Sequence, residues 1–258
     1  MIIIRVIFRY AIKIIANFIK LLSYVFHYIL PDKRFSIPKH AEPIISKNNF
    51  HIIPNVVWQT NFTNKVTLPV YINYIFNRIM SPTYFFRFCT DEDMIKYIEQ
   101  NYNDEILSNY LSLTIGASRA DYWRILVLYK CGGVYMDIDA NLMWPLEFII
   151  KPYDSEIFLQ LKDKSITNFF MASKKSNNNY KKIIDTINNN IKNRSSNSVY
   201  SLTGPNAVSK ALDIEKINTA QRKYICNQGN FTNKYFQYVD KKDGYWVEKQ
   251  KIVPIIKC

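Results

Sequence analysis

The stretch from Ala117 to Leu146, ASRADYWRILVLYKCGGVYMDIDANLMWPL, constrains the fold more than any other part of the chain. Residues 118–130 predict a helix that is capped by Ser118, carries an apolar face and ends at Gly132-Gly133. Residues 134–139 then predict a short strand. A helix that turns tightly into an apolar strand indicates α/β layering.

Two carboxylates stand at the end of this predicted strand. Asp137 and Asp139 are two residues apart, so a strand directs both to one side while Ile138 points back into the core. Carboxylates this close repel each other unless a positive group lies between them. A hard divalent cation fits such a pair, because it takes oxygen ligands from Asp and from phosphates and stabilises a departing diphosphate.

The preceding helix adds a second charged pair. Asp121 and Arg124 are three residues apart and share a helix face. Because the tight turn folds this helix against the strand, both side chains are expected to converge on Asp137. Arginine binds phosphate or carboxylate, and aspartate accepts hydrogen bonds from sugar hydroxyls. The alternative is a surface Asp–Arg pair beside a solvated strand end.

Other enzyme classes fit these residues poorly. A calcium-binding EF-hand loop that begins at Asp137 would need Gly and Glu where Leu142 and Phe148 stand. Phosphatases with an aspartyl nucleophile also carry two such acids after an apolar strand, but a Gly-Gly approach in mid-chain is not typical of them. The only histidines are His27, His40 and His51, and none lies near a nucleophile elbow.

The rest of the chain alternates short apolar runs with helical segments, as one α/β domain does. Strands are predicted at 55–60, 156–161 and 169–172, and helices from the capping residue Asp91 through Ile98, over 179–191 and from Pro205. Four scattered cysteines without a CxxC motif indicate neither a disulfide framework nor a zinc site and favour a reducing compartment.

The first 30 residues predict an amphipathic helix. Arg5, Arg9, Lys13 and Asn17 recur every four residues, with Lys20 close by, and the surrounding residues are apolar. The charge-free runs are too short for a spanning helix and no small-residue cleavage site follows, so a helix lying on anionic lipid is favoured. The alternative is a helix packed on its own domain or on a partner subunit.

The division of the chain follows from this segment. Residues 1–35 are expected to be the membrane-associating helix, 36–50 a polar linker and 51–258 the catalytic domain. The net charge is +13, and the first 40 residues hold seven Lys or Arg and one Asp. This concentration indicates an anionic surface as partner, whereas no motif indicates nucleic acid.

Several motifs together resemble glycosyltransferase family 32. The segment RADYWRILVLYKCGGVYMDID is similar to the DxD signature of that family. IPNVVWQT at 53–60 resembles its first strand, CTDED at 89–93 its W-T-D-x-D segment with Cys in place of Trp, and 203–205 its TGP segment. The resemblance covers roughly residues 50–210.

The resemblance implies a GT-A fold, a nucleotide-diphospho-sugar donor, Mn²⁺ or Mg²⁺, and transfer with retention at the anomeric carbon. It implies that Asp121 and Arg124 hold the donor sugar, that Asp137 contacts ribose and sugar hydroxyls, and that Asp139, with Asp137, binds the metal. The other residues to which it assigns donor contacts are Trp58 (stacked on the base), Gln59, Ser118, Arg119, Gly204, Tyr245 and Trp246.

One departure concerns the metal. Members of the family often place a metal- or phosphate-binding histidine near the C-terminus, and this chain has no histidine after His51. Gly244-Tyr245-Trp246 resembles the remnant of that region. The expected function is transfer of a hexose or N-acetylhexosamine to a surface polysaccharide or lipooligosaccharide acceptor, peripherally at the cytoplasmic face of the plasma membrane. A toxin- or effector-like protein glycosyltransferase and a non-catalytic nucleotide-sugar or polyanion-binding module are the alternatives.

Overall fold

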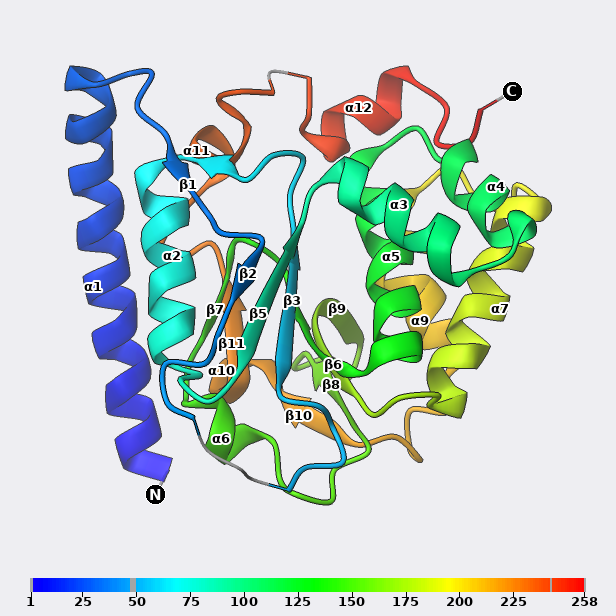
Figure 1. The fold of residues 1–258 in the computed structure, drawn as a ribbon, viewed down its shortest axis with the longest axis horizontal. Coiled ribbons are helices and arrows are strands. Elements are labelled where there is room, and N and C mark those ends of the chain that lie inside the picture. The colour runs from blue at the N-terminus through cyan, green and yellow to red at the C-terminus, as the bar shows by residue number, and fades with distance from the viewer. Residues whose placement is uncertain (1, 47–49, 242, 258) are drawn as a thin grey trace.

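The protein is described by a computed structural model that covers residues 2–46, 50–241 and 243–257. A mixed seven-stranded sheet forms its centre, in the order β10-β8-β9-β6-β3-β5-β2 (Figure 1). The strands β3, β5 and β6 run parallel to one another, while β9 pairs antiparallel with β6. The strand bounds are β2 His40–Ala41, β3 Val56–Thr60, β5 Phe85–Cys89, β6 Gly133–Met136, β8 Glu156–Gln160, β9 Ile166–Ser173 and β10 Thr219–Gln221.

Helices cover both faces of this sheet. The long helix α1 and its neighbour α2 lie on one side, and the helices α3, α4, α5, α7 and α9 lie on the other (Figure 1). Their bounds are α1 Ile2–Ile29, α2 Leu68–Ile79, α3 Asp91–Asn101, α4 Asp104–Ser112, α5 Gly116–Cys131, α7 Asn178–Lys192 and α9 Pro205–Ala211. The predicted α/β class and the predicted N-terminal helix are both confirmed.

Side-chain alternation on β6 shows why two layers form. Val134 and Met136 are buried in the apolar cluster on the α2 side, whereas Tyr135 between them is buried on the α5 side. A strand that is covered on both faces is apolar throughout, as in this segment. Short elements complete the fold: β1 Phe35–Ser36, β4 Lys65–Val66, β7 Ala140–Leu142, α6 Leu146–Ile149, α8 Val199–Leu202, α10 Arg222–Ile225, β11 Cys226–Gln228, α11 Lys234–Tyr238 and α12 Trp246–Ile252.

The turn between α5 and β6 depends on glycine. Gly132 and Gly133 have φ angles of 69° and 103°, which favour glycine. A Cβ atom on Gly133 would lie 2.5 Å from Cγ1 of Val56, so a side chain there would separate β6 from β3. The prediction that these glycines end the helix is confirmed, and the strand begins at Gly133, one residue before the predicted start at Val134.

Two predicted helix caps are displaced. The helix α5 begins at Gly116, and Ser118 lies buried in its first turn, where its hydroxyl donates to the carbonyl of Ile115 at 2.7 Å. Ser118 therefore does not cap the helix. The cap of α3 is Thr90, which forms a capping box with Asp93, so Asp91 is the first helical residue and not the cap.

The segment predicted as a linker contributes to the folded body. Ile37 is fully buried, β1 pairs with β4, and β2 extends the main sheet beside β5. The polar composition of residues 36–50 does not reveal these strand pairings, because each of the two strands is only two residues long. Residues 47–49 of this predicted linker lie outside the described residues. None of the described helices combines the length and the apolar character needed to cross a membrane.

Candidate active site

A tight turn, not a continued strand, brings the two predicted metal ligands together. The strand β6 ends at Met136, and the backbone N–H of Asp137 donates to the carbonyl of Phe169 at 2.8 Å. The N–H of Ala140 then donates to the carbonyl of Asp137 at 2.9 Å, which closes the turn. The prediction of a strand through Asp139 is therefore wrong, although both carboxylates still face one site.

Ile138 lies between the two acids and is only half-buried. It packs against the α2-side cluster, as predicted, and also borders the cavity described below. Its carbonyl accepts a hydrogen bond of 2.8 Å from the amide of Asn73 on α2. This contact fixes the turn on the helix behind it.

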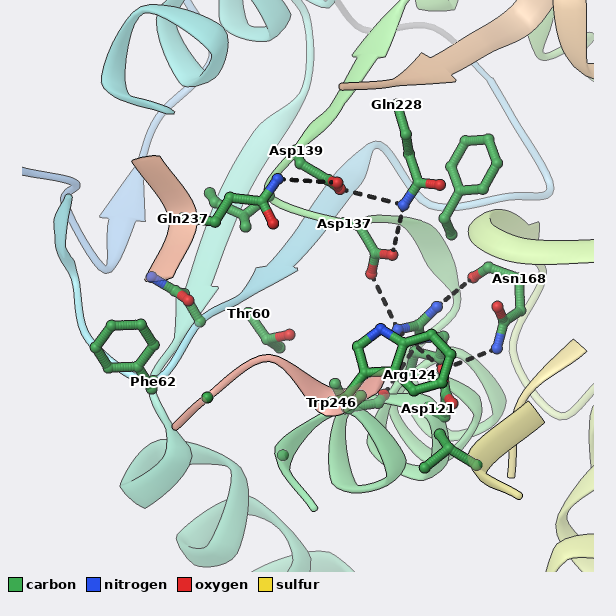
Figure 2. Close-up of a pocket in the computed structure, with 18 of the residues that line it drawn as sticks. Thr60, Phe62, Asp121, Arg124, Asp137, Asp139, Asn168, Gln228, Gln237 and Trp246 are labelled. Atoms are coloured by element: carbon green, nitrogen blue, oxygen red, sulfur yellow. Dashed lines mark hydrogen bonds and ion pairs between the residues drawn. The ribbon is translucent and has the colours of Figure 1, made fainter. Parts of the chain in front are cut away.

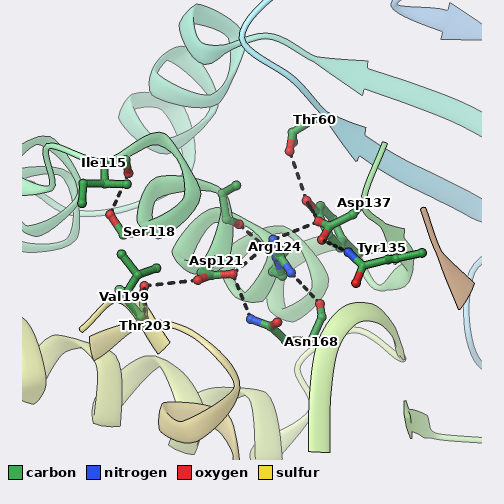
Figure 3. A network of polar contacts seen from close by, with 12 residues as sticks. Thr60, Ile115, Ser118, Asp121, Arg124, Tyr135, Asp137, Asn168, Val199 and Thr203 are labelled. Atoms are coloured by element: carbon green, nitrogen blue, oxygen red, sulfur yellow. Dashed lines mark hydrogen bonds and ion pairs between the residues drawn. The ribbon is translucent and has the colours of Figure 1, made fainter. Parts of the chain in front are cut away.

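Arg124 connects the two pairs of acidic residues. Its Nη2 atom lies 3.1 Å from Oδ1 of Asp121 and 3.0 Å from Oδ1 of Asp137 (Figure 3). The guanidinium also lies over the ring of Tyr135, 4.5 Å from its centroid, and the Tyr135 hydroxyl donates to Asp137 at 2.9 Å. The predicted convergence of Asp121 and Arg124 on Asp137 is confirmed.

Polar groups of two other elements hold this ion network in place. The Nη1 atom of Arg124 donates to the carbonyl of Asn168 on β9 at 2.7 Å. The amide of Asn168 donates to Asp121 at 2.9 Å, and the hydroxyl of Thr203, which follows α8, donates to the other oxygen of Asp121 at 3.4 Å. Buried and multiply bonded side chains of this kind have fixed positions.

Two glutamines contact the acidic pair from the C-terminal part of the chain. The Nε2 atom of Gln228 on β11 lies 3.1 Å from Oδ2 of Asp137 and 3.1 Å from Oδ1 of Asp139 (Figure 2). The Nε2 atom of Gln237 on α11 lies 3.1 Å from Oδ2 of Asp139. Sequence reasoning missed both residues.

The site carries more negative than positive charge. Burial, with the nearby charge of Asp137, raises the pKa of Asp139 to about 6. Burial likewise raises the pKa of Asp121 to about 6, although Arg124 opposes this effect. The pKa of Asp137 is raised by burial as well, against Arg124. Three ionised aspartates beside one arginine leave two negative charges, which a divalent cation would balance.

These raised pKa values predict how stability depends on pH. Between the ordinary value of 3.8 and about 6, the folded protein binds more protons than the unfolded chain at Asp121 and Asp139. The free energy of unfolding therefore decreases as pH rises through this range. We expect the metal-free protein to melt at lower temperature at about pH 7 than at about pH 4.5. Thermal melting in the presence of a chelator measures this difference, and Asp139→Asn should make the melting temperature less dependent on pH. A melting temperature that rises with pH and does not respond to this substitution would contradict the prediction.

The acidic turn borders a cavity of about 460 Å³. This volume is within the range of pockets that hold small organic ligands. Tyr245 and Trp246, which the sequence predicted as donor contacts, both border it. Other bordering residues that sequence reasoning did not find are Thr60, Asn61, Phe62, Asp91, Asn168, Gln228, Lys234, Gln237 and Lys241.

Trp58 does not border this cavity. Its indole Nε1 donates to the carbonyl of Gly132 at 3.0 Å, and its ring packs edge-on against Trp123 with centroids 6.1 Å apart. The structure therefore gives Trp58 a role in joining β3 to the α5–β6 turn. The aromatic ring on this side of the cavity belongs to Phe62, four residues further on, with Lys241 Nζ 4.8 Å from its centroid.

Four further predicted donor contacts also lie outside the cavity lining. Gln59 is buried in the sheet, and Ser118 bonds to its own helix, as described above. Arg119 donates from Nε to the carbonyl of Leu113 at 2.8 Å. Gly204 is the N-cap of α9, where a Cβ atom would lie 3.0 Å from the backbone of Tyr200.

No cluster of three or more His, Cys, Asp or Glu side chains suited to a metal ion is found in the described part of the chain. The oxygen ligands available at the turn are the carboxylates of Asp137 and Asp139 and, after rotation of their amides, the carbonyl oxygens of Gln228 and Gln237. An amide side chain carries both a donor and an acceptor, so the same residue serves either role.

A known sequence family matches the part of the chain that contains this site. Residues 55–156 match the sequence family described as a glycosyltransferase sugar-binding region containing a DXD motif. The matched range includes Asp121, Arg124 and both acids of the turn. This chain resembles glycosyltransferase family 32. The resemblance inferred from the motifs is thereby confirmed, and the comparisons support a glycosyltransferase.

Two yeast proteins are similar to part of the chain. The initiation-specific α-1,6-mannosyltransferase of Schizosaccharomyces pombe is 30% identical over 124 residues, which are 44% of this chain and 28% of that protein. Inositol phosphoceramide mannosyltransferase 3 of the same yeast is 33% identical over 98 residues, 38% of this chain and 27% of that protein. The match thus spans less than a third of the length of either relative.

A solved structure is similar over most of the fold. The PaToxG glycosyltransferase structure matches with a TM-score of 0.53 and 19% sequence identity, and the match covers 83% of this chain and 80% of that one. At this identity the comparison establishes the fold. The predicted GT-A-like architecture is confirmed, and the acidic turn lies at the carboxyl end of the central strand β6.

Proposed function

We propose that the protein is a metal-dependent, retaining glycosyltransferase that uses a nucleotide-diphospho-sugar. The observation that carries the proposal is the Asp121–Arg124–Asp137 network beside Asp139, at the wall of a cavity large enough for such a donor. Retention and the Mn²⁺ or Mg²⁺ requirement come from the family resemblance. The excess of two negative charges at the turn supports a divalent cation.

The residues of the turn fit a hard cation. Asp139 makes no ion pair among the described residues, and the side chains that donate to its two oxygens are the uncharged amides of Gln228 and Gln237. It is therefore the residue that would hold the ion, with Asp137 beside it. A bound divalent cation would supply Lewis-acid stabilisation of the departing diphosphate.

The remaining residues would orient the donor and exclude water. Asp121 has its carboxylate fixed by Asn168 and Thr203, so that it accepts sugar hydroxyl hydrogen bonds in one geometry. Arg124 keeps Asp137 in position and balances part of the buried charge. Lys234 and Lys241 border the same cavity and would supply positive charge for phosphate oxygens. Trp246 and Phe62 offer apolar surface for the sugar and the base.

The acceptor is proposed to be a glycan or a lipid-linked glycan, with a hexose or N-acetylhexosamine transferred to it. Both S. pombe relatives are named mannosyltransferases, and one of them acts by name on inositol phosphoceramide, a lipid. A lipid-linked acceptor is consistent with a peripheral position of this protein at the cytoplasmic face of the plasma membrane. Such an acceptor is the kind that is extended in the synthesis of a surface polysaccharide or lipooligosaccharide.

A donor-hydrolysis screen tests the proposal. UDP- and GDP-sugars are incubated with the full chain, with Mn²⁺, with Mg²⁺ and with chelator, and the released nucleotide and sugar anomer are measured. Metal-dependent release of one sugar with its anomeric configuration retained is the expected result. Binding of nucleotide-sugars or polyanions without turnover under any of these conditions would instead favour a non-catalytic module. Transfer only to protein acceptors would favour the effector-like alternative.

The glutamine at the turn gives a test of the metal shell. Gln228→Glu adds a third carboxylate beside Asp137 and Asp139, so it should tighten Mn²⁺ binding about tenfold and lower the melting temperature of the metal-free protein. Calorimetric titration of Mn²⁺ measures the first effect without any substrate. The matched control is Gln221→Glu at the exposed end of β10, which should change neither quantity. Weaker Mn²⁺ binding by Gln228→Glu would contradict this arrangement.

A further inference from the structure

The helix α1 packs on the domain through the side that carries its basic residues. Near its start, Arg5 lies over the ring of Trp144 at 5.2 Å and Phe8 contacts the same ring edge-on at 5.4 Å. In the middle, Ile12 and Ala16 are buried in a small cluster with Phe231. These contacts attach the first half of the helix.

The second half is attached in the same way. Lys20 donates from Nζ to the carbonyl of Gly229 at 2.9 Å. Near the end of α1, Nε2 of His27 accepts from the backbone N–H of Leu68, the first residue of α2, at 3.0 Å. The helix α1 therefore lies alongside α2, extends beyond both of its ends and also contacts α10 (Figure 1). Turning α1 end-on into a bilayer would break these contacts with the domain.

The outward side of α1 is apolar from end to end. Six of its residues recur at intervals of three, four and seven and have exposed fractions between 56% and 74%. These six are Ile3, Ile7, Ile14, Phe18, Leu21 and Val25. A contiguous apolar face along 28 residues is about 42 Å long, far larger than the scattered apolar residues that ordinary soluble surfaces expose. Such a face marks a site of interaction.

The charges of α1 indicate what covers this face. The helix contains four Lys or Arg and no Asp or Glu. In the described part of the chain, none of these four cations pairs with a carboxylate. Arg9 and Lys13 are half-buried at the boundary between the packed and the outward face, and Arg9 lies 4.9 Å from the ring centroid of Tyr10. Cations that border an apolar face match the headgroups of an anionic bilayer.

A second copy of the chain fits this face less well. The α1 of a second copy would offer no acidic residue to pair with Arg9 or Lys13. The outward face also has no buried polar residue to fix a register between two helices. We propose that α1 lies in the plane of an anionic membrane, with its apolar face at the boundary of the headgroups and acyl chains and the domain held against the surface.

Flotation with lipid vesicles tests the proposal on the full chain. Vesicles of phosphatidylcholine, with or without phosphatidylglycerol, are mixed with wild type, Ile14→Glu, Lys13→Gln and Ile252→Glu. Wild type should float with the anionic vesicles. Ile14→Glu should reduce the partition coefficient at least about tenfold, because a charge enters the apolar face. Lys13→Gln should reduce it about fivefold on anionic vesicles only.

The control substitution lies on another element. Ile252 on α12 is 78% exposed and distant from α1 in the fold, so Ile252→Glu should float like wild type. Equal flotation of Ile14→Glu and wild type overturns the proposal. The proposal is also overturned if wild type does not float with vesicles and instead forms a dimer in light scattering that Ile14→Glu dissociates. Donor hydrolysis in solution should be the same in Ile14→Glu and wild type, so failure here is distinguishable from failure of the proposed reaction.

Discussion

Asp139→Asn is expected to lower metal-dependent donor hydrolysis at least about a hundredfold while the fold is retained. The carboxylate of Asp139 faces the cavity and makes no ion pair with Arg124, whereas Asp137 does. Asparagine has the same shape and keeps one oxygen, but it lacks the charge that a divalent cation requires. Released nucleotide is measured with saturating Mn²⁺, and Mn²⁺ affinity is measured separately by titration.

The stability of this variant separates a chemical effect from a structural one. Because burial raises the pKa of Asp139 to about 6, the ionised side chain at pH 7 destabilises the metal-free protein. Asp139→Asn should therefore melt at the same or a higher temperature than wild type in chelator. The control Asp185→Asn removes a half-exposed carboxylate that pairs with Lys181 on α7, and it should leave hydrolysis unchanged. Wild-type hydrolysis by Asp139→Asn would refute the assignment of the metal site.

The central part of the site could be predicted because it is local in the sequence. The spacing of Asp121 and Arg124 on one helix face, and the Gly132-Gly133 turn, are enough to bring both residues to Asp137. The prediction of this convergence does not depend on whether residues 137–139 form a strand or a turn. A turn at residues 137–140 gives the same side-chain convergence as the predicted strand, which is why the site was found although the strand end was placed wrongly.

The glutamines could not be predicted in this way. Gln228 and Gln237 lie 89 to 98 residues after the acids that they contact, on short elements without a motif. The pairing of β11 with β7, which puts Gln228 opposite Ala140, is a long-range choice that local patterns do not encode. The prediction that Trp58 contacts the donor was wrong for a related reason. A half-buried position on β3 is compatible both with a cavity wall and with packing against Trp123.

For the helix α1, the sequence pattern could not predict which face packs on the domain. Its sequence defines an apolar face and a basic stripe, but an amphipathic pattern does not state which face packs on the domain. The usual arrangement buries the apolar face. Here the guanidinium of Arg5 lies over the ring of Trp144, the ammonium of Lys20 donates to the carbonyl of Gly229, and the apolar face is outward. Only the tertiary contacts distinguish the two orientations.

Arg124→Leu is expected to have the largest effect on stability of any single substitution at the site. The arginine is almost fully buried and holds two carboxylates, those of Asp121 and Asp137. Removing one partner of a buried ion network leaves uncompensated charge and costs about 3–5 kcal/mol. For a chain of this size, that loss lowers the melting temperature by roughly 10 °C. The matched control is Arg87→Leu, whose partner Glu42 is exposed, and it should cost less than about 1 kcal/mol.

Two further measurements identify buried charge as the cause. Adding Asp121→Asn to Arg124→Leu should recover part of the lost stability, because one of the two unpaired carboxylates becomes neutral. Lower pH should also reduce the deficit. Without Arg124 the pKa of Asp121 should rise above its value of about 6, and the folded protein then takes up protons that the unfolded chain does not bind. A deficit that is independent of pH and unaffected by Asp121→Asn would mean that Arg124 stabilises the fold through its packing against the ring of Tyr135 and not through its ion pairs.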